Sequence, residues 1–331
     1  MRKLFIFGNG LGMALAPDVY NLNSVMTSAW DNKYLTETQK KLILACLPDD
    51  VSKPTSEEQL AKLQEIVGAC EVLLGIRPVA FGHWLSPHGQ EFPNAVHQFA
   101  FEVAKQMFLA KHKQGSQVGE PCRLPTDFVK SLIAKVEETQ SHVATLNYDG
   151  LLSSAFEMAG VLGDGKVLRD GFIDQKFDTR NLFRHREEGG WYLHLHGCPL
   201  FVDREKSKPS KLAASSLTRN LGQLKHVGRH IVLTHVTHKR TIIAGSEILS
   251  TYWEFLKRAL DESQEIVIFG YSGNDTHLNQ LIAQKRADKL VRVVEWLGAG
   301  YEDLRGPFWA AQLGGPVNLT LKEDVLTFAD W

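Results

Sequence analysis

The sequence has few cysteines, no long apolar run and no excess of one charge. Its 331 residues include four scattered cysteines, and none of them forms a CxxC pair: Cys46, Cys70, Cys122 and Cys198. This spacing provides neither a disulfide framework nor the thiolate pairs of a zinc site, so we expect no metal. Because no apolar stretch could span a bilayer and residues 1–7 lack a signal-peptide pattern, we expect a soluble, cytoplasmic protein without a membrane partner.

The charge balance argues against a polyanionic partner. The chain carries 37 Lys and Arg against 38 Asp and Glu, a formal net charge of -1. Such a balance creates no global field that attracts nucleic acid or an anionic membrane. We therefore expect no direct nucleic-acid binding.

Short apolar segments alternate with helix-period segments along much of the chain. Six of these apolar segments are predicted strands: Lys3–Phe7, His142–Leu146, Trp191–Leu195, Thr241–Ala244, Glu265–Phe269 and Leu290–Val294. Alternation of buried strands with helices is typical of a doubly wound α/β sheet. We predict one domain over residues 1–331 with a Rossmann-like, mostly parallel sheet flanked by helices. Ligands of such sheets bind at the carboxyl ends of the strands.

Residues 21–138 interrupt this alternation and are predicted to form a helical insertion after the first strand. Two capping boxes support helices here, Thr36 with Gln39 and Ser56 with Gln59. The insertion could supply a pocket wall or an oligomer surface, and simple scaffolding is the alternative for most of its residues.

The segment Val202–Arg240 is irregular and rich in histidine. It contains four histidines, His226, His230, His235 and His238. The spacing of the last two could suit a metal, but strand-like alternation would send their rings to opposite faces. A mobile or partner-contacting loop is the favoured interpretation.

A glycine-rich turn follows the first predicted strand. The sequence Gly8-Asn9-Gly10-Leu11-Gly12 stands where a strand would pass into a helix. Glycines at this place let backbone N–H groups approach a diphosphate, and the following helix adds its positive end. The third glycine of the dehydrogenase GxGxxG pattern is missing, and an ordinary tight turn is the alternative.

Two further predicted strands end in polar residues. Asn147 and Asp149 follow the strand His142–Leu146, where they could hold a ribose and a carboxamide, although a helix cap is an alternative. His194 and His196 occupy alternate positions of the next strand, and Gly197 frees the turn after it. His196 is placed like a general base, whereas His194 is interpreted as structural. We expect Asn147, Asp149 and His196 to line one cleft.

The strand Glu265–Phe269 leads into a second glycine turn. Gly270 and Gly273 again allow close backbone approach beside Ser272, and Asp275 can cap the next helix. This turn could hold a second part of a nucleotide, and a simple capped turn is the alternative. Glu295, at the end of the strand Leu290–Val294, is expected to be an exposed carboxylate rather than a ribose ligand.

The order of these motifs resembles the sirtuin-like family of bacterial NAD hydrolases. The resemblance rests on four loops, Gly8-Asn9-Gly10, Thr145-Leu146-Asn147-Tyr148-Asp149, Leu195-His196-Gly197 and Gly270-Tyr271-Ser272-Gly273-Asn274-Asp275. It implies that NAD+ is the substrate and that Asn147 and His196 are the catalytic pair. It also implies that Asp149 contacts the nicotinamide carboxamide. The turn Gly8, Asn9, Gly10 and Gly12 would cradle the diphosphate, and Gly270, Ser272 and Asp275 would lie on the adenosine side.

Protein-deacylating sirtuins differ from this sequence in two respects. They carry a structural zinc on two CxxC pairs and an arginine-bearing segment after the glycine loop, and neither is found here. The resemblance therefore implies hydrolysis of NAD+ to nicotinamide and ADP-ribose rather than deacylation. It further implies an NAD-depleting effector of antiphage defence that acts as a homo-oligomer with a partner such as a DNA-translocating ATPase. The alternatives are a non-catalytic module that senses NAD or ADP-ribose, a deacylase and a dehydrogenase.

Overall fold

A parallel sheet forms the centre of the computed structural model, which describes residues 1–77, 82–114, 117–185, 188–203, 208–218, 227–233 and 236–331. Its strand order is β13-β12-β11-β1-β4-β8-β5, and every neighbouring pair is parallel. In that order the strands are Asn318–Lys322, Leu290–Trp296, Glu265–Phe269, Lys3–Phe7, His142–Thr145, Gly190–His194 and Leu168–Arg169. This confirms the predicted Rossmann-like, mostly parallel α/β sheet.

The strand order reverses beside β1. From β1 the chain continues to β4 and β8 on one side, and it returns to β11 on the other side before it forms β12 and β13. Because these strands are parallel, the residues that follow β1, β4, β8 and β11 lie together at the carboxyl ends of the strands. In sheets of this kind ligands bind at such a reversal, outside the carboxyl ends of the strands.

Most predicted strands lie where the apolar segments predicted them. β1 and β11 have the predicted bounds, and β4, β8 and β12 differ from prediction by one or two residues at an end. The predicted strand Thr241–Ala244 is wrong, because these residues form the end of helix α9 (Val236–Gly245). A four-residue apolar run does not distinguish a strand from one buried turn of a helix.

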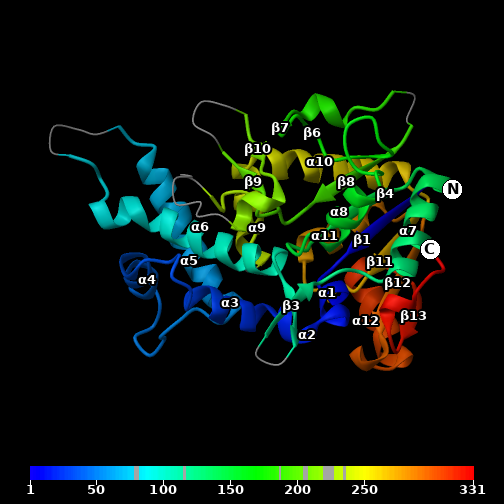
Figure 1. Cartoon of the computed structure of the whole chain (residues 1–331), viewed down its shortest axis with the longest axis horizontal. Helices are drawn as coiled ribbons and strands as arrows, with labels where there is room; N and C mark the ends of the chain where they lie inside the picture. The colour runs from blue at the N-terminus through cyan, green and yellow to red at the C-terminus, as the bar shows by residue number, and fades with distance from the viewer. Residues whose placement is uncertain (78–81, 115–116, 186–187, 204–207, 219–226, 234–235) are drawn as a thin grey trace.

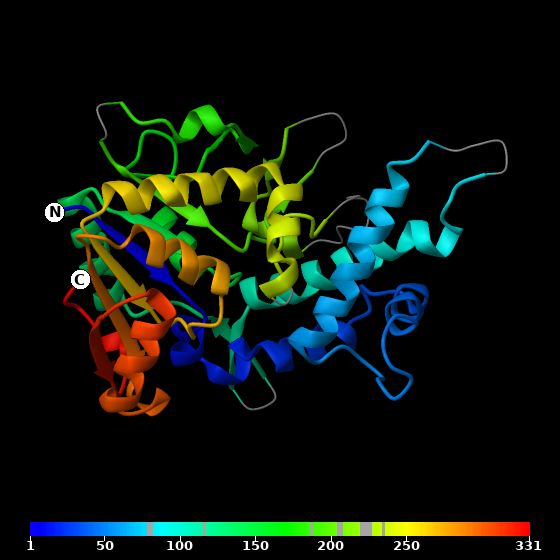
Figure 2. The ribbon, with the colours of Figure 1, turned by 180° about the vertical axis from the view of Figure 1, so that it is seen from behind.

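The helices between β1 and α7 form a lobe beside the sheet (Figures 1 and 2). Both predicted capping boxes are present, at Thr36 for α4 and at Ser56 for α5. The elements of this stretch are α1 Gly10–Leu15, α2 Pro17–Tyr20, α3 Leu22–Trp30, α4 Glu37–Leu44, α5 Glu57–Leu74, α6 Pro87–Phe108, and the hairpin β2 Lys111–Gln114 and β3 Gln117–Pro121. In both views α3 to α6 lie on the side of the sheet away from the two marked ends of the chain.

Helices cover both faces of the sheet. α10 (Glu247–Glu262) and α11 (Thr276–Lys285) run over one face in Figure 2. α7 (Thr126–Thr139) packs Phe128 on Phe269 of β11, with ring centroids 5.5 Å apart. α7 therefore covers the sheet, although it falls mostly within the stretch 21–138 predicted as an insertion. The other elements are α8 Leu151–Met158, α12 Glu302–Leu313 and a small antiparallel sheet of β6 Phe172–Ile173, β7 Lys176–Phe177, β10 Ser210–Lys211 and β9 Phe201–Val202.

The described residues contain neither a membrane-spanning helix nor a cluster of metal-binding side chains. None of the helices found there is both long enough and apolar enough to traverse a bilayer. In the same part of the chain, no three or more His, Cys, Asp or Glu side chains are grouped so that they could hold a metal ion.

Trp331 fills an aromatic cluster against the sheet. It is 3% exposed, its ring lies 5.1 Å from that of Phe128 and 5.6 Å from that of Phe269, and its indole N–H donates to Ser131 at 2.9 Å. We expect Trp331→Ala to lower the free energy of unfolding by about 3–5 kcal/mol in urea denaturation, because it leaves a large cavity. Trp84→Ala is the control, since Trp84 is 66% exposed and should change stability by less than about 0.5 kcal/mol. Equal losses in the two variants would contradict this packing account.

Candidate functional site

The turns after β1 and β11 touch backbone to backbone. The N–H of Gly8 donates to the carbonyl of Phe269 at 2.9 Å, and the N–H of Gly10 donates to the carbonyl of Gly270 at 2.7 Å. A Cβ atom at position 10 would lie 2.6 Å from the Gly270 oxygen, and Gly270 itself has φ of +59°. No side chain fits at Gly10 without moving the backbone, so glycine here sets the distance between the two turns.

The glycines of the first turn have contacts that differ from those expected from the sequence. The N–H groups of Gly8 and Gly10 were expected to face a diphosphate, but the neighbouring turn already accepts both of them. Gly12 lies under the ring of Tyr20, where a Cβ atom would be 2.9 Å from Tyr20 Cγ. The Asn9 amide donates to the Tyr20 carbonyl at 3.1 Å, and its Oδ1 is buried without a hydrogen bond in the described structure.

Asn147 is tied to the first glycine turn. It follows β4, is 4% exposed, and donates from Nδ2 to the Gly8 carbonyl at 3.0 Å. Because a carbonyl can only accept, this bond fixes which end of the amide is oxygen. Oδ1 of Asn147 is buried and has no hydrogen-bond partner among the described residues. The fold therefore holds an oriented amide oxygen without a hydrogen bond in a residue that lines the cavity, and such a buried acceptor calls for an explanation.

Asp149 follows Asn147 by two residues and lines a different cavity. Its Oδ1 accepts the N–H of Leu151 at 2.9 Å, while Oδ2 is buried and unpartnered in the part of the chain described. Burial raises the pKa of Asp149 to about 6, against the opposing effect of the Leu151 N–H and the Asn147 amide. The structure thus places Asn147 and His196 in one cavity and Asp149 in the lining of another.

His196 forms a buried pair with Asp275. β8 ends at His194, so His196 stands in the turn after it, and its Nε2 lies 2.9 Å from Oδ2 of Asp275. The same oxygen accepts from Nζ of Lys239 at 3.1 Å. Asp275 also caps α11 as the sequence predicted, with Oδ1 accepting the N–H groups of His277 and Leu278. The carboxylate of Asp275 therefore holds both the start of α11 and the ring of His196.

Burial and charge set the protonation of this pair. Burial lowers the pKa of His196, the charge of Lys239 lowers it further, and Asp275 and the backbone of Leu146 oppose this without reversing it. Burial raises the pKa of Asp275, but the hydrogen bond from His196 and the nearby Lys239 outweigh burial and hold it well below its usual range. At neutral pH the pair consists of a neutral imidazole and a carboxylate, which is the form that can accept a proton.

His194 lies in an apolar environment instead. It is 2% exposed, with its ring 4.9 Å from that of Tyr192 and 5.4 Å from that of Phe201. Burial lowers the pKa of His194 to about 3. The strand ends between the two histidines, so their rings have different surroundings rather than the shared face that alternation predicted.

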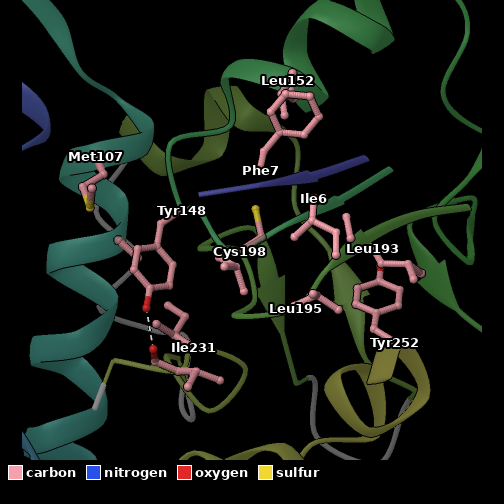
Figure 3. Close-up of a cluster of buried hydrophobic side chains, with 14 of the residues drawn as sticks. Ile6, Phe7, Met107, Tyr148, Leu152, Leu193, Leu195, Cys198, Ile231 and Tyr252 are labelled. Atoms are coloured by element: carbon pink, nitrogen blue, oxygen red, sulfur yellow. Dashed lines mark hydrogen bonds between the residues drawn. The ribbon is translucent and has the colours of Figure 1, made fainter. Parts of the chain in front are cut away.

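One cavity of about 190 Å³ brings these groups together at the strand ends. From the sequence-predicted set its lining contains Gly8, Asn9, Gly10, Asn147, His196, Gly270, Ser272 and Asp275. The helical lobe supplies part of the wall through Leu22, Leu60 and Met107. Figure 3 shows Tyr148 beside Met107, with its hydroxyl donating to the carbonyl of Val232 next to Ile231. The lobe therefore contributes part of the wall of this cavity, which is one of the roles considered for the insertion.

Among the polar lining residues, sequence reasoning missed four, Lys239, Tyr148, Tyr271 and Asn274. Tyr148, Tyr271 and Asn274 stood inside quoted motifs, so their position was a usable signal. No sequence signal pointed to Lys239, because it belongs to α9, a segment that was interpreted as strand and loop. Without that helix no pattern places a lysine beside Asp275.

Residues 141–295 match the SIR2-like domain family model. This SIR2-like segment, residues 141–295, includes Asn147, His196 and Asp275, whereas the Gly8–Gly10 turn lies outside it. Among solved structures, the chain is similar to one described as a triple mutant of Sir2 homologues in complex with 2'-O-acetyl ADP ribose. The match has 11% identity and a TM-score of 0.40, and it covers 99% of this chain and 89% of that one. A search of curated proteins found no match.

The other polar residues considered from sequence are engaged elsewhere in the structure. Glu295, near the end of the SIR2-like segment, was expected to be exposed, but it is 4% exposed and pairs with Arg305 of α12 at 2.5 and 3.0 Å. This expectation was wrong because α12 covers that strand end. His230 lies between Ser246 and Asp203, at 2.7 and 3.0 Å. His226 and His235 fall outside the described residues, and His238 belongs to α9 rather than to a strand.

The contact between the two glycine turns can be tested by matched alanine substitutions. We expect Gly10→Ala to lower the free energy of unfolding by about 1–3 kcal/mol, because the new Cβ atom would overlap the Gly270 backbone. Gly68→Ala in α5 is the control, since a Cβ atom there meets nothing within 4 Å. That change should stabilise the protein by up to about 1 kcal/mol through helix propensity. Urea denaturation measures both, and a neutral Gly10→Ala would contradict the contact.

Proposed function

We propose that the chain hydrolyses NAD+ to nicotinamide and ADP-ribose. The observation that carries this proposal is the meeting of two groups in one cavity, the oriented amide oxygen of Asn147 and the neutral His196 held by Asp275. The SIR2-like match over residues 141–295 supports NAD-related chemistry at this place. The resemblance to sirtuin-like NAD hydrolases suggests the more specific reaction, hydrolysis of NAD+. The positions and the chemistry of Asn147 and His196 are compatible with it.

Asn147 would act on the charge that develops at the ribose. Loss of nicotinamide leaves a sugar with oxocarbenium character, and a fixed amide oxygen stabilises such positive charge without reorganising. The bond from Nδ2 to Gly8 holds the amide in that orientation before substrate arrives. Asn147 would also orient a ribose hydroxyl or the attacking water through the same oxygen.

His196 would receive the proton. The bond from C1' of the ribose to the nicotinamide nitrogen breaks, and its electron pair leaves with nicotinamide. Water then forms the new C1'–O bond. The proton from that water, or from a ribose hydroxyl that relays it, passes to His196 and then to solvent. Asp275 stabilises the imidazolium formed. The leaving group already carries the positive charge, so no step requires a metal.

The remaining assignments of the resemblance extend this proposal. Gly270, Ser272 and Asn9 line the cavity and would contact the rest of the dinucleotide. Asp149 lines the other cavity, so the contact with the carboxamide that the resemblance implies would require its side chain to turn toward this one. A role as an NAD-depleting antiphage effector, assembly into a homo-oligomer and a DNA-translocating ATPase partner also belong to the proposal.

The size of the cavity bears on regulation. About 190 Å³ is smaller than the roughly 300–1,000 Å³ typical of small-molecule sites, and a dinucleotide is a large ligand. Binding therefore requires part of the wall to move, and Leu22, Leu60 and Met107 belong to the lobe. A lobe displaced by assembly would open the site, in accord with an enzyme that stays silent until triggered.

The reaction is tested by incubating the purified chain, alone and at high concentration, with NAD+ and quantifying nicotinamide and ADP-ribose by chromatography. Equal amounts of the two products are expected. Nicotinamide release only in the presence of an acetylated peptide would favour a deacylase. NAD+ binding without cleavage, also with the chain concentrated enough to assemble, would favour a sensing module.

Removal of either catalytic group should strongly lower turnover while leaving the fold intact. We expect His196→Ala to lower kcat by about a hundred- to ten-thousand-fold, the usual contribution of a general base, and Asn147→Ala to have a comparable effect. His88→Ala and Asn318→Ala are the matched controls, because both side chains are exposed. NAD+ affinity should change little, since these groups act mainly on the transition state. Wild-type turnover in folded His196→Ala would refute the assignment.

Lys239 should set the pH dependence of cleavage. Its charge lowers the pKa of His196, and the base must be neutral to accept a proton. In wild type the acidic limb of kcat/KM should therefore lie below the ordinary histidine range, and Lys239→Met should move it to higher pH. Lys257→Met, which removes an exposed lysine paired with Glu254, is the control. An unmoved acidic limb in Lys239→Met would contradict this electrostatic role.

A further inference from the structure

A second and larger cavity lies on the other side of the Asn147–Gly150 loop. Its volume is about 560 Å³, within the range of small-molecule sites. The C-terminal end of α6, the connection from β3 to α7, and the helices α7 and α8 form its walls. The proposed reaction uses none of these walls.

A buried carboxylate stands at the inner end of this cavity. Asp149 lines it, is 5% exposed, and has an Oδ2 atom without a hydrogen bond among the described residues. An unsatisfied buried carboxylate oxygen is costly, because it has lost water and gained no donor. Oδ2 itself is closed to solvent, so a ligand that offers an N–H donor reaches it after a small shift of the lining and then removes that cost.

The walls beyond Asp149 are apolar and only partly covered. Phe108, Leu109, Val129 and Ile133 pack on the core yet keep part of their surface open, and Met158 is 72% exposed. All five line the cavity. Surfaces of this kind accept a flat ring, because an aromatic face buries apolar area on both sides.

Three cations stand at the mouth. Lys111, Arg123 and Lys130 line the cavity and are exposed. Within the described part of the chain, no carboxylate lies within 4 Å of any of the three, so their charges are available to a ligand. Arginine and lysine side chains bind phosphate through charge-assisted hydrogen bonds.

We propose that this cavity is a second ligand site, separate from the Asn147–His196 cavity, that binds an adenine mononucleotide. The exocyclic amino group donates to Oδ2 of Asp149, the purine lies against the apolar walls, and the phosphate meets Lys111, Arg123 and Lys130. An acceptor inside, apolar walls and cations outside match the order of groups along such a nucleotide. The proposal concerns binding alone and stands whether or not the chain cleaves NAD+.

The first test compares three ligands on the wild-type chain by calorimetry. The probes are AMP, adenosine, which lacks the phosphate, and purine riboside 5'-monophosphate, which lacks the amino group. We expect AMP to bind about tenfold or more tightly than either, the usual consequence of losing a charged hydrogen-bonded contact. Equal affinity for all three, or no binding of AMP at millimolar concentration, would overturn the proposal.

The second test locates the nucleotide. 8-Azido-AMP should label peptides of α7 and α8, and Lys130→Glu and Ser154→Trp should each weaken AMP binding about tenfold or more. Lys166→Glu is the matched control, because Lys166 is exposed and lies outside the cavity lining. Circular dichroism checks that each variant is folded. Labelling confined to peptides of the Gly8–Gly10 and Gly270–Asp275 turns, or unchanged affinity in folded Ser154→Trp, would assign AMP to the other cavity.

Discussion

The close contact between the turns after β1 and β11 is the constraint on which the site depends. Gly10 and Gly270 meet at a distance that excludes any side chain, and their hydrogen bond joins the two halves of the sheet where the strand order reverses. Asn147 is then anchored to Gly8 on one side, and Asp275 follows the second turn on the other. The Asn147 amide and the His196 ring are thus each tied to one of the two turns, Asn147 through Gly8 and His196 through Asp275.

The parts predictable from sequence were those encoded in local patterns. Buried strands such as Glu265–Phe269, the caps at Thr36 and Ser56, and the order of the polar loops follow from short-range rules. What could not be predicted depends on contacts across the chain. The pairing of His196 with Asp275 joins residues 79 positions apart, and nothing in the sequence near Lys239 indicates that α9 would bring it there.

Burial bears on both the proposed chemistry and the access to the site. Burial and the charge of Lys239 lower the pKa of His196, which keeps the ring neutral, and the Asn147 oxygen is buried as well. A small, buried cavity strengthens electrostatic effects on a bound ribose, yet it also limits access to a dinucleotide. In this account the helical lobe sets the polarity of the site and controls its opening.

The most direct test of the central claim is a crystal structure of the His196→Ala variant with NAD+. The account predicts an intact dinucleotide with its nicotinamide ribose against the Asn147 oxygen and beside position 196. Its remainder should lie over the Gly8–Gly10 and Gly270–Ser272 turns, with the wall of Leu22, Leu60 and Met107 moved outward. NAD+ bound with its nicotinamide ribose away from Asn147, or seated only between α7 and α8, would contradict the account.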